Sequence, residues 1–214
     1  MRILRFNDAG IPARHAGSTR TSFNMDRSTG SVLAATTKWL AQYNPGGENR
    51  GFVLHGEVGR GKTHLLVAVL RELVFKVGVG VRFVEFSHLL AALKAGFDEG
   101  RGAEEVLRPL VEVEVLAIDE LGKGRNTDFE QMVIDELVSR RYNAGGVILA
   151  TTNYGPGSGT GLRTLNAGDA EIRTQTLVDR VGHRVYSRLR ETADFIEMGG
   201  EDYREKLARR RREV

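Results

Sequence analysis

The stretch Gly56-Glu-Val-Gly-Arg-Gly-Lys-Thr63 matches the pattern GxxxxGK followed by Ser or Thr. Its glycines allow backbone N–H groups to converge on phosphate oxygens without a clash from Cβ atoms. A helix that starts directly behind such a loop adds its positive end to the site. In this pattern Lys62 reaches the β and γ phosphates, and the hydroxyl of Thr63 holds Mg²⁺. The stretch therefore predicts a binding site for a nucleotide and Mg²⁺.

The residues on both sides of this loop have the patterns that a phosphate site requires. Residues 51–55 form a short apolar run of the strand type. From His64 onward, apolar residues recur with the 3.6-residue period of a helix as far as Val77. The alternative is a glycine-rich turn that contains Lys-Thr by chance. Such a turn would not need a strand before it and an amphipathic helix after it, so the flanking patterns favour the phosphate site.

Further strands and helices alternate along the chain. The patterns predict strands at 81–86, 113–118, 147–152 and 194–198, and helices at 31–43, 87–97, 103–111, 127–143, 171–191 and 201–214. This alternation is typical of an α/β fold with a parallel sheet of five strands. Residues 1–30 lack clear periodicity and are expected to be an N-terminal arm or linker, followed by one domain at 31–214 that carries the phosphate loop. Residues 154–170 are expected to be a flexible loop.

Composition excludes several classes of protein. The chain of 214 residues has no Cys, which removes disulfides, Cys-ligated zinc and thiol nucleophiles. Charged residues make up 28% and are dispersed, and no apolar run has the length of about 18 residues that a membrane span needs. No signal peptide is recognisable, so we expect a cytoplasmic protein without a membrane partner.

Two carboxylates follow the apolar strand Val115-Leu-Ala-Ile118. Asp119 is expected to bind Mg²⁺, and Glu120 is expected to act as the base that orients an attacking water molecule. An adjacent Asp-Glu pair could also be a solvated strand end. The apolar strand before it and the phosphate loop upstream favour the catalytic interpretation. Because the chain has no Asn-Lys-x-Asp guanine motif, we expect ATP hydrolysis.

Two further sets of polar residues are candidates for this site. Asn153 ends the strand at 147–152, and its amide would face the ligand crevice, where it could contact the γ-phosphate; an Asx turn is the alternative. Arg180, Arg184 and Arg188 are four residues apart and are expected to share one helix face. Such a face is either solvated, or it meets the γ-phosphate of a neighbouring chain in a head-to-tail assembly.

Several motifs together resemble the DnaC/DnaI-type helicase loaders and the related IstB transposition helpers, within the AAA+ ATPases. They are Gly10-Ile-Pro12, Gly56 to Leu65, Ile118-Asp-Glu-Leu-Gly122, Ser139-Arg-Arg-Tyr142, Thr151-Thr-Asn153, Ser187-Arg-Leu189 and Gly200-Glu-Asp-Tyr-Arg204. The resemblance extends over about residues 9–206. It implies the AAA+ form of the P-loop NTPase fold, with a five-stranded parallel sheet between helices and without a full C-terminal helical lid.

The resemblance also implies a role for individual residues. Lys62, Thr63, Asp119 and Glu120 match the Walker A and B positions, and Asn153 matches sensor 1. Arg188 matches the arginine finger that acts in trans, with Arg180 and Arg184 as supporting residues, and Arg204 matches sensor 2. The expected nucleotide-binding residues are Gly56, Glu57, Val58, Gly59, Arg60, Gly61, Lys62, Thr63, His64 and Arg204.

The implied partners follow from the same resemblance. They are a replicative helicase, single-stranded DNA and further copies of the chain, which would assemble in a nucleotide-dependent manner. Two helices between the second and third strands are similar to the initiator-type insertion that touches single-stranded DNA. Lys94, Arg101 and Arg108 are therefore candidate contacts, with solvated helix faces as the alternative. The loaders carry an N-terminal domain that grips the helicase, whereas only about 30 residues precede the first predicted helix here.

Three other functions remain open at this point. An IstB-like ATPase would remodel target DNA for a transposase. A stand-alone P-loop phosphotransferase would use the same phosphate loop and would not need Glu120. An adaptor that switches partners on ATP binding alone would bind the nucleotide without hydrolysing it.

Overall fold

Five parallel strands form the central sheet of the computed structural model, which describes residues 2–23, 29–100, 102–157, 162–163, 172–173, 175–200 and 202–203. The strands are β1 (Gly51–His55), β2 (Val81–Glu85), β3 (Val115–Asp119), β4 (Val147–Thr152) and β7 (Ala193–Glu197). Their order across the sheet is β2-β3-β4-β1-β7. Every neighbouring pair is parallel, so all five carboxyl ends lie at one edge. The predicted α/β class and five-stranded sheet are confirmed.

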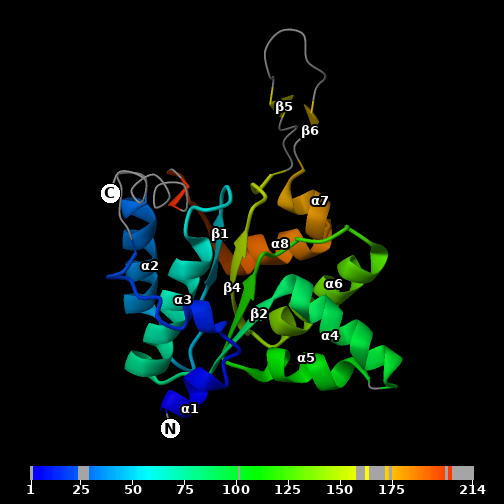
Figure 1. Ribbon diagram of the computed structural model, residues 1–214, viewed down its shortest axis with the longest axis horizontal. Helices are drawn as coiled ribbons and strands as arrows, with labels where there is room; N and C mark the ends of the chain where they lie inside the picture. Colours follow the sequence, from blue (N-terminus) through cyan, green and yellow to red (C-terminus); the bar gives the residue numbers. More distant parts are fainter. Residues whose placement is uncertain are drawn as a thin grey trace, which may run out of the picture.

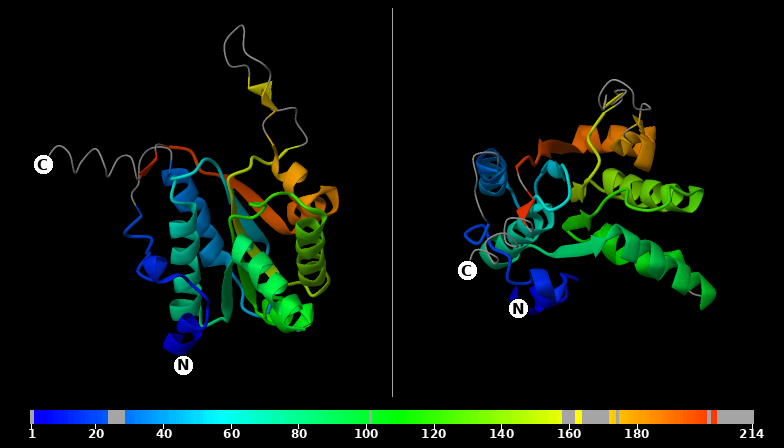
Figure 2. Two further views of the ribbon diagram at one scale, coloured as in Figure 1. Left: turned by 45° about the vertical axis from the view of Figure 1, so that its right-hand side comes forward. Right: turned by 45° about the horizontal axis from the view of Figure 1, so that its top comes forward.

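Helices cover both faces of this sheet (Figure 1; Figure 2). Helices α2 (Gly30–Gln42) and α3 (Lys62–Glu72) lie on one face, and α3 continues into a π-helical turn, η2 (Leu73–Val77). On the other face lie α4 (Phe86–Asp98), α5 (Ala103–Glu112), α6 (Asp128–Asn143) and α8 (His183–Thr192). Among the described residues, no helix combines the length and the apolar character that crossing a membrane requires.

Alternating strand residues fill two separate cores. In β3, Val115 and Ala117 pack toward α2 and α3, whereas Leu116 and Ile118 pack toward α4 to α8. Strands β1 and β4 alternate in the same way, and all of their residues are buried. Because the central strands are buried on both faces, their sequences are continuous apolar runs, which explains why the patterns located them well.

The segment before α2 packs against the domain. It contains α1 (Arg2–Asn7) and a short 3-10 helix, η1 (Ala13–His15). Ala9 is fully buried, and its carbonyl accepts a hydrogen bond of 2.6 Å from the backbone N–H of Phe83 at the sheet edge. The ring of Phe23 is buried as well. The expected arm therefore lies along the sheet edge and α3, as Figure 1 shows, although its sequence has no helical period.

Two expectations for the C-terminal third are corrected. The helix predicted at 171–191 is two helices, α7 (Leu177–Val181) and α8, because Gly182 has a φ of +80° and interrupts the helical backbone. The loop predicted at 154–170 contains β5 (Leu162–Arg163), which pairs in antiparallel fashion with β6 (Ile172–Arg173). The helical tail predicted at 201–214 lies almost entirely outside the described residues, so the expected absence of a full lid stays a prediction.

One buried arginine connects the helical layer to the sheet. Arg141 of α6 is 1% exposed, and its two terminal nitrogens donate hydrogen bonds to four backbone carbonyls, those of Val111, Val113, Glu114 and Val147. Burial lowers the pKa of Arg141 to about 10. A guanidinium satisfies four acceptors in a plane, which a lysine ammonium cannot reproduce.

We therefore expect Arg141→Lys to lower the free energy of unfolding by about 2–4 kcal/mol, because buried carbonyls lose charged donors. Arg140→Lys is the matched control, since Arg140 is in an exposed ion pair with Glu104 and the change should cost less than about 1 kcal/mol. Urea unfolding followed by circular dichroism measures both values. Equal losses for the two variants would contradict this assignment.

Candidate nucleotide site

The phosphate loop connects β1 to α3 at the carboxyl edge of the sheet. Gly59 and Gly61 have φ values of +80° and +89°, and Gly61 is the residue before the first turn of α3. A Cβ on Gly56 would lie 2.3 Å from the backbone carbonyl oxygen of Met198, so a larger residue there would displace the main chain. The loop is thus shaped by positive-φ glycines at the helix N-terminus, as its sequence predicts.

Lys62 points back across this loop. Its ammonium donates hydrogen bonds of 2.7 Å to the carbonyls of Gly56 and Glu57. The residue is 7% exposed, and burial lowers the pKa of Lys62 to about 8, although the carboxylates of Asp119 and Glu120 act in the opposite direction. The positive charge is therefore held in the loop with little solvation, where a phosphate is a favourable partner.

Asp119 is the buried carboxylate of the site. The hydroxyl of Thr63 donates to both of its oxygens, at 3.0 and 3.1 Å, and the hydroxyl of Thr151 donates to Oδ1 at 2.5 Å. Burial raises the pKa of Asp119, and the two hydroxyl hydrogen bonds oppose that shift. Three elements, α3, β3 and β4, therefore converge on one carboxylate.

Glu120 begins the turn that follows β3 and has a φ of +54°. Its backbone N–H donates to the hydroxyl of Thr151 at 3.0 Å, which fixes the direction in which the chain leaves the strand. The carboxylate is partly exposed and forms an ion pair with Lys123. The sheet register also places Glu85 of β2 beside Asp119. The predicted Asp-Glu pair therefore supplies one buried carboxylate, bonded to Thr63 of the loop, and one partly exposed carboxylate, paired with Lys123.

These side chains line a cavity of about 430 Å³. Its walls include the loop residues Val58, Gly59, Gly61, Lys62, Thr63 and His64 and the strand-end residues Glu85, Asp119, Glu120, Thr151 and Asn153. Of the expected nucleotide residues, Gly56, Glu57 and Arg60 belong to the loop but do not line the cavity; Arg60 pairs with Glu57. Arg204 lies outside the described residues, whereas the adjacent Tyr203 lines the cavity.

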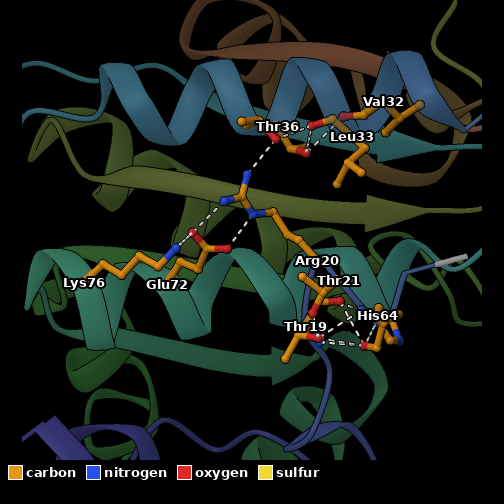
Figure 3. Close-up of polar contacts among 11 residues, drawn as sticks. Thr19, Arg20, Thr21, Val32, Leu33, Thr36, His64, Glu72 and Lys76 are labelled. Atoms are coloured by element: carbon orange, nitrogen blue, oxygen red, sulfur yellow. Dashed lines mark hydrogen bonds and ion pairs between the residues drawn. The ribbon is translucent and has the colours of Figure 1, made fainter. Parts of the chain in front are cut away.

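The N-terminal arm supplies another wall, through Arg14, His15, Gly17 and Ser18. Several contacts attach the arm to α3, and Figure 3 shows two of them. A ring nitrogen of His64 lies 3.0 Å from the carbonyl of Thr19, and the guanidinium of Arg20 donates to both oxygens of Glu72. The ring of Phe23 packs over Gly61. Sequence reasoning missed this wall because tertiary contacts, not a repeating pattern, place it.

The expected arginine face divides between two elements. Arg180 belongs to α7, is 8% exposed and donates to the carbonyls of Gly122 and Gly124, at 2.7 and 2.5 Å. This contact holds the turn after β3, so the expectation that Arg180 shares an exposed face with Arg184 and Arg188 is wrong. The latter two lie on α8 and pair with Asp135 of α6, away from the cavity of their own chain.

The candidate DNA contacts lie on the helices inserted between β2 and β3. Lys94 of α4 is exposed, and its ammonium lies 5.3 Å from the centre of the Phe129 ring. Arg108 of α5 is exposed, and Arg101 lies outside the described residues. None of them lines the cavity. A role in DNA binding stays a prediction.

The donor set at the base of the cavity fits Mg²⁺. This ion prefers oxygen ligands, is held by few protein side chains, and takes its other ligands from water and substrate phosphates. The Thr63 hydroxyl and the Asp119 carboxylate are such ligands, and they already lie within hydrogen-bond distance of one another. They would hold the ion beside Lys62, where it would neutralise charge on the β and γ phosphates.

The topology and the site together define the class. Strand β4 separates the phosphate-loop strand β1 from the Asp-Glu strand β3, and the edge formed by their carboxyl ends carries the nucleotide residues. This arrangement is that of a P-loop NTPase of the AAA+ class. The family described as IstB-like ATP binding protein matches residues 20–211, and the chain belongs to this family.

Similar proteins are consistent with this assignment. The chain is 40% identical to the uncharacterized protein YdaV of Escherichia coli K12 over 90 residues, which is 42% of this chain and 36% of YdaV. It is 27% identical to the replicative helicase loader DnaC of the same organism over 138 residues, 64% of this chain and 55% of DnaC. A crystal structure of the DnaC helicase loader superposes with a TM-score of 0.72 at 25% identity, covering 88% of this chain and all of the other. The chain spans about a third to a half of the length of the curated relatives that it matches.

Nucleotide affinity should depend on pH through Lys62. A bound phosphate favours the charged ammonium, so metal-free ATP should bind with uptake of a proton at pH 8.5, and affinity should fall as pH rises through about 8. Calorimetry in EDTA, repeated in buffers of different ionisation enthalpy, measures the uptake. The Lys62→Met variant should bind ATP more weakly, and its binding should show no proton uptake from residue 62. Proton-neutral binding by the unmodified chain would contradict the prediction.

The arm should loosen when Glu72 loses its charge. Glu72→Gln weakens the half-buried pair with Arg20, and we expect a loss of about 1 kcal/mol in local stability, with amide exchange about fivefold faster over residues 13–23. Lys76→Gln is the matched control, because Lys76 contacts the same carboxylate from an exposed position. Hydrogen-exchange mass spectrometry compares the two. Equal exchange in both variants would show that the pair does not hold the arm.

Proposed function

We propose that this chain hydrolyses ATP with Mg²⁺ and acts in DNA replication in the manner of a helicase loader. The observation that carries the proposal is the convergence of Thr63, Thr151 and Asp119 at the phosphate loop, with Glu120 directly beside them. In this arrangement Lys62 and the metal would balance phosphate charge, and Glu120 would orient the attacking water. Asn153 lines the same cavity and would contact the γ-phosphate or that water.

The position of Arg188 supports a proposal of head-to-tail assembly. The residue does not line the described cavity of its own chain, and its side chain, on α8, is 19% exposed. An arginine of a neighbouring chain that reaches the γ-phosphate accelerates hydrolysis by stabilising charge in the transition state. We therefore assign Arg188 to the site of a neighbouring copy, assembled when ATP is bound.

The proposed partners are a replicative helicase and single-stranded DNA. Support comes from the similarity to the replicative helicase loader DnaC over 64% of this chain. Exposed cations on the inserted helices, Lys94 and Arg108, would meet the DNA backbone. The matching family name favours a second candidate, an IstB-like ATPase that assists a transposase.

Hydrolysis is tested with Glu120→Gln. Removing the base should lower the turnover number by at least about 100-fold while the dissociation constant for ATP changes less than about threefold. Steady-state turnover and equilibrium binding measure the two quantities. Turnover at the unmodified rate would exclude Glu120 as the base, and absence of turnover in the unmodified chain would favour an ATP-switched adaptor.

The same variant distinguishes the partners. Held in the ATP state, Glu120→Gln is mixed with purified replicative helicase and circular single-stranded DNA, and in parallel with a transposase and duplex DNA. ATP-dependent co-elution with the helicase supports the loader function. Co-elution with the transposase alone supports the second candidate and contradicts the first.

A further inference from the structure

The contact between α6 and α8 contains a polar cluster outside the nucleotide cavity. Its centre is Asp135 of α6, which pairs with two arginines of α8, Arg188 at 3.3 Å through Oδ1 and Arg184 at 3.4 Å through Oδ2. The hydroxyl of Ser139 donates to the same carboxylate at 3.3 Å and accepts a hydrogen bond from Arg188. One aspartate is therefore shared by two cations and a hydroxyl.

The two arginines are not equivalent. The side chain of Arg188 is 19% exposed, whereas that of Arg184 is 68% exposed. The guanidinium of Arg188 also lies 5.4 Å from the centre of the Tyr142 ring, and the Tyr142 hydroxyl donates to Glu191 at 2.9 Å. Arg188 is thus enclosed by a carboxylate, a hydroxyl and an aromatic face, and Arg184 lies at the rim.

The geometry of Arg188 leaves part of its guanidinium available. Among the residues that the structure describes, Asp135 and Ser139 both bond to Nη1. A guanidinium carries five N–H donors in a rigid plane, so fixing one nitrogen sets the direction of the others. An arginine that is held in this way loses less side-chain entropy when an anion arrives than one that is free in solvent.

We propose that Asp135 is a positioning residue that aims Arg188 at the nucleotide of the neighbouring chain. This inference rests on the proposed role of Arg188 in trans. Asp135 does not touch the reacting atoms; it fixes one end of the guanidinium, with Ser139 and Tyr142 as the other two supports. Small displacements of a catalytic group reduce the rate steeply, so loss of this support should lower turnover more than nucleotide binding.

Mixing two variants isolates the effect. Arg188→Ala chains keep a complete nucleotide site, and Lys62→Ala chains keep a complete Arg188, so hydrolysis in the mixture uses the arginine of the second chain. Asp135→Asn is then added to one chain at a time. On the Lys62→Ala chain it should lower the turnover number by roughly fivefold to tenfold with the KM for ATP unchanged. On the Arg188→Ala chain it should have no effect.

Glu136→Gln is the matched control for charge, because Glu136 is the next residue of α6 and its nearest ion-pair contact, with Arg140, is 4.0 Å long. It should leave the mixture unchanged on either chain. Equal losses of turnover from Asp135→Asn on the two chains would show that Asp135 has only a structural role. An unchanged or increased turnover number when Asp135→Asn is on the Lys62→Ala chain would also overturn the proposal. If the mixture without Asp135→Asn shows no hydrolysis, the trans role of Arg188 fails, and the inference fails with it.

Discussion

A single buried carboxylate sets the arrangement of the nucleotide end of this protein. Asp119 lies where a strand buried on both faces reaches the edge of the sheet, and an unpaired charge there would be costly. Hydroxyls from α3 and β4 satisfy it, and the Thr151 hydroxyl also accepts the backbone N–H of Glu120. The phosphate loop, the proposed metal ligands and the proposed base are therefore positioned together by one hydrogen-bonded group.

The sequence predicted the parts whose structure depends on short patterns. Strands β1 and β4 were predicted at their observed bounds because both are continuous apolar runs between polar turns. The phosphate loop was found because it needs glycines at fixed spacing. The helix predicted at 127–143 starts where expected, because Thr127 caps α6 locally: its side chain accepts a hydrogen bond from the backbone N–H of Glu130.

Long-range contacts explain what the sequence left out. The arm has no period to detect, yet Arg20, Phe23 and Ala9 attach it to distant residues, and through these contacts it lines the nucleotide cavity. Arg180 fits the spacing of an exposed face, but the break at Gly182 and two backbone carbonyls place it inside. The role proposed for Asp135 has no local sequence signal, because its contacts with Arg184 and Arg188 depend on which helix packs against α6.

The central claim is that Asp119 binds the metal of a bound nucleotide. Electron paramagnetic resonance of Mn²⁺ with a slowly hydrolysed ATP analogue tests it directly. We expect one protein-bound Mn²⁺ per chain, loss of that signal in Asp119→Asn, and retention in Glu120→Gln, which removes the neighbouring carboxylate. An unchanged Mn²⁺ signal in Asp119→Asn would contradict the account.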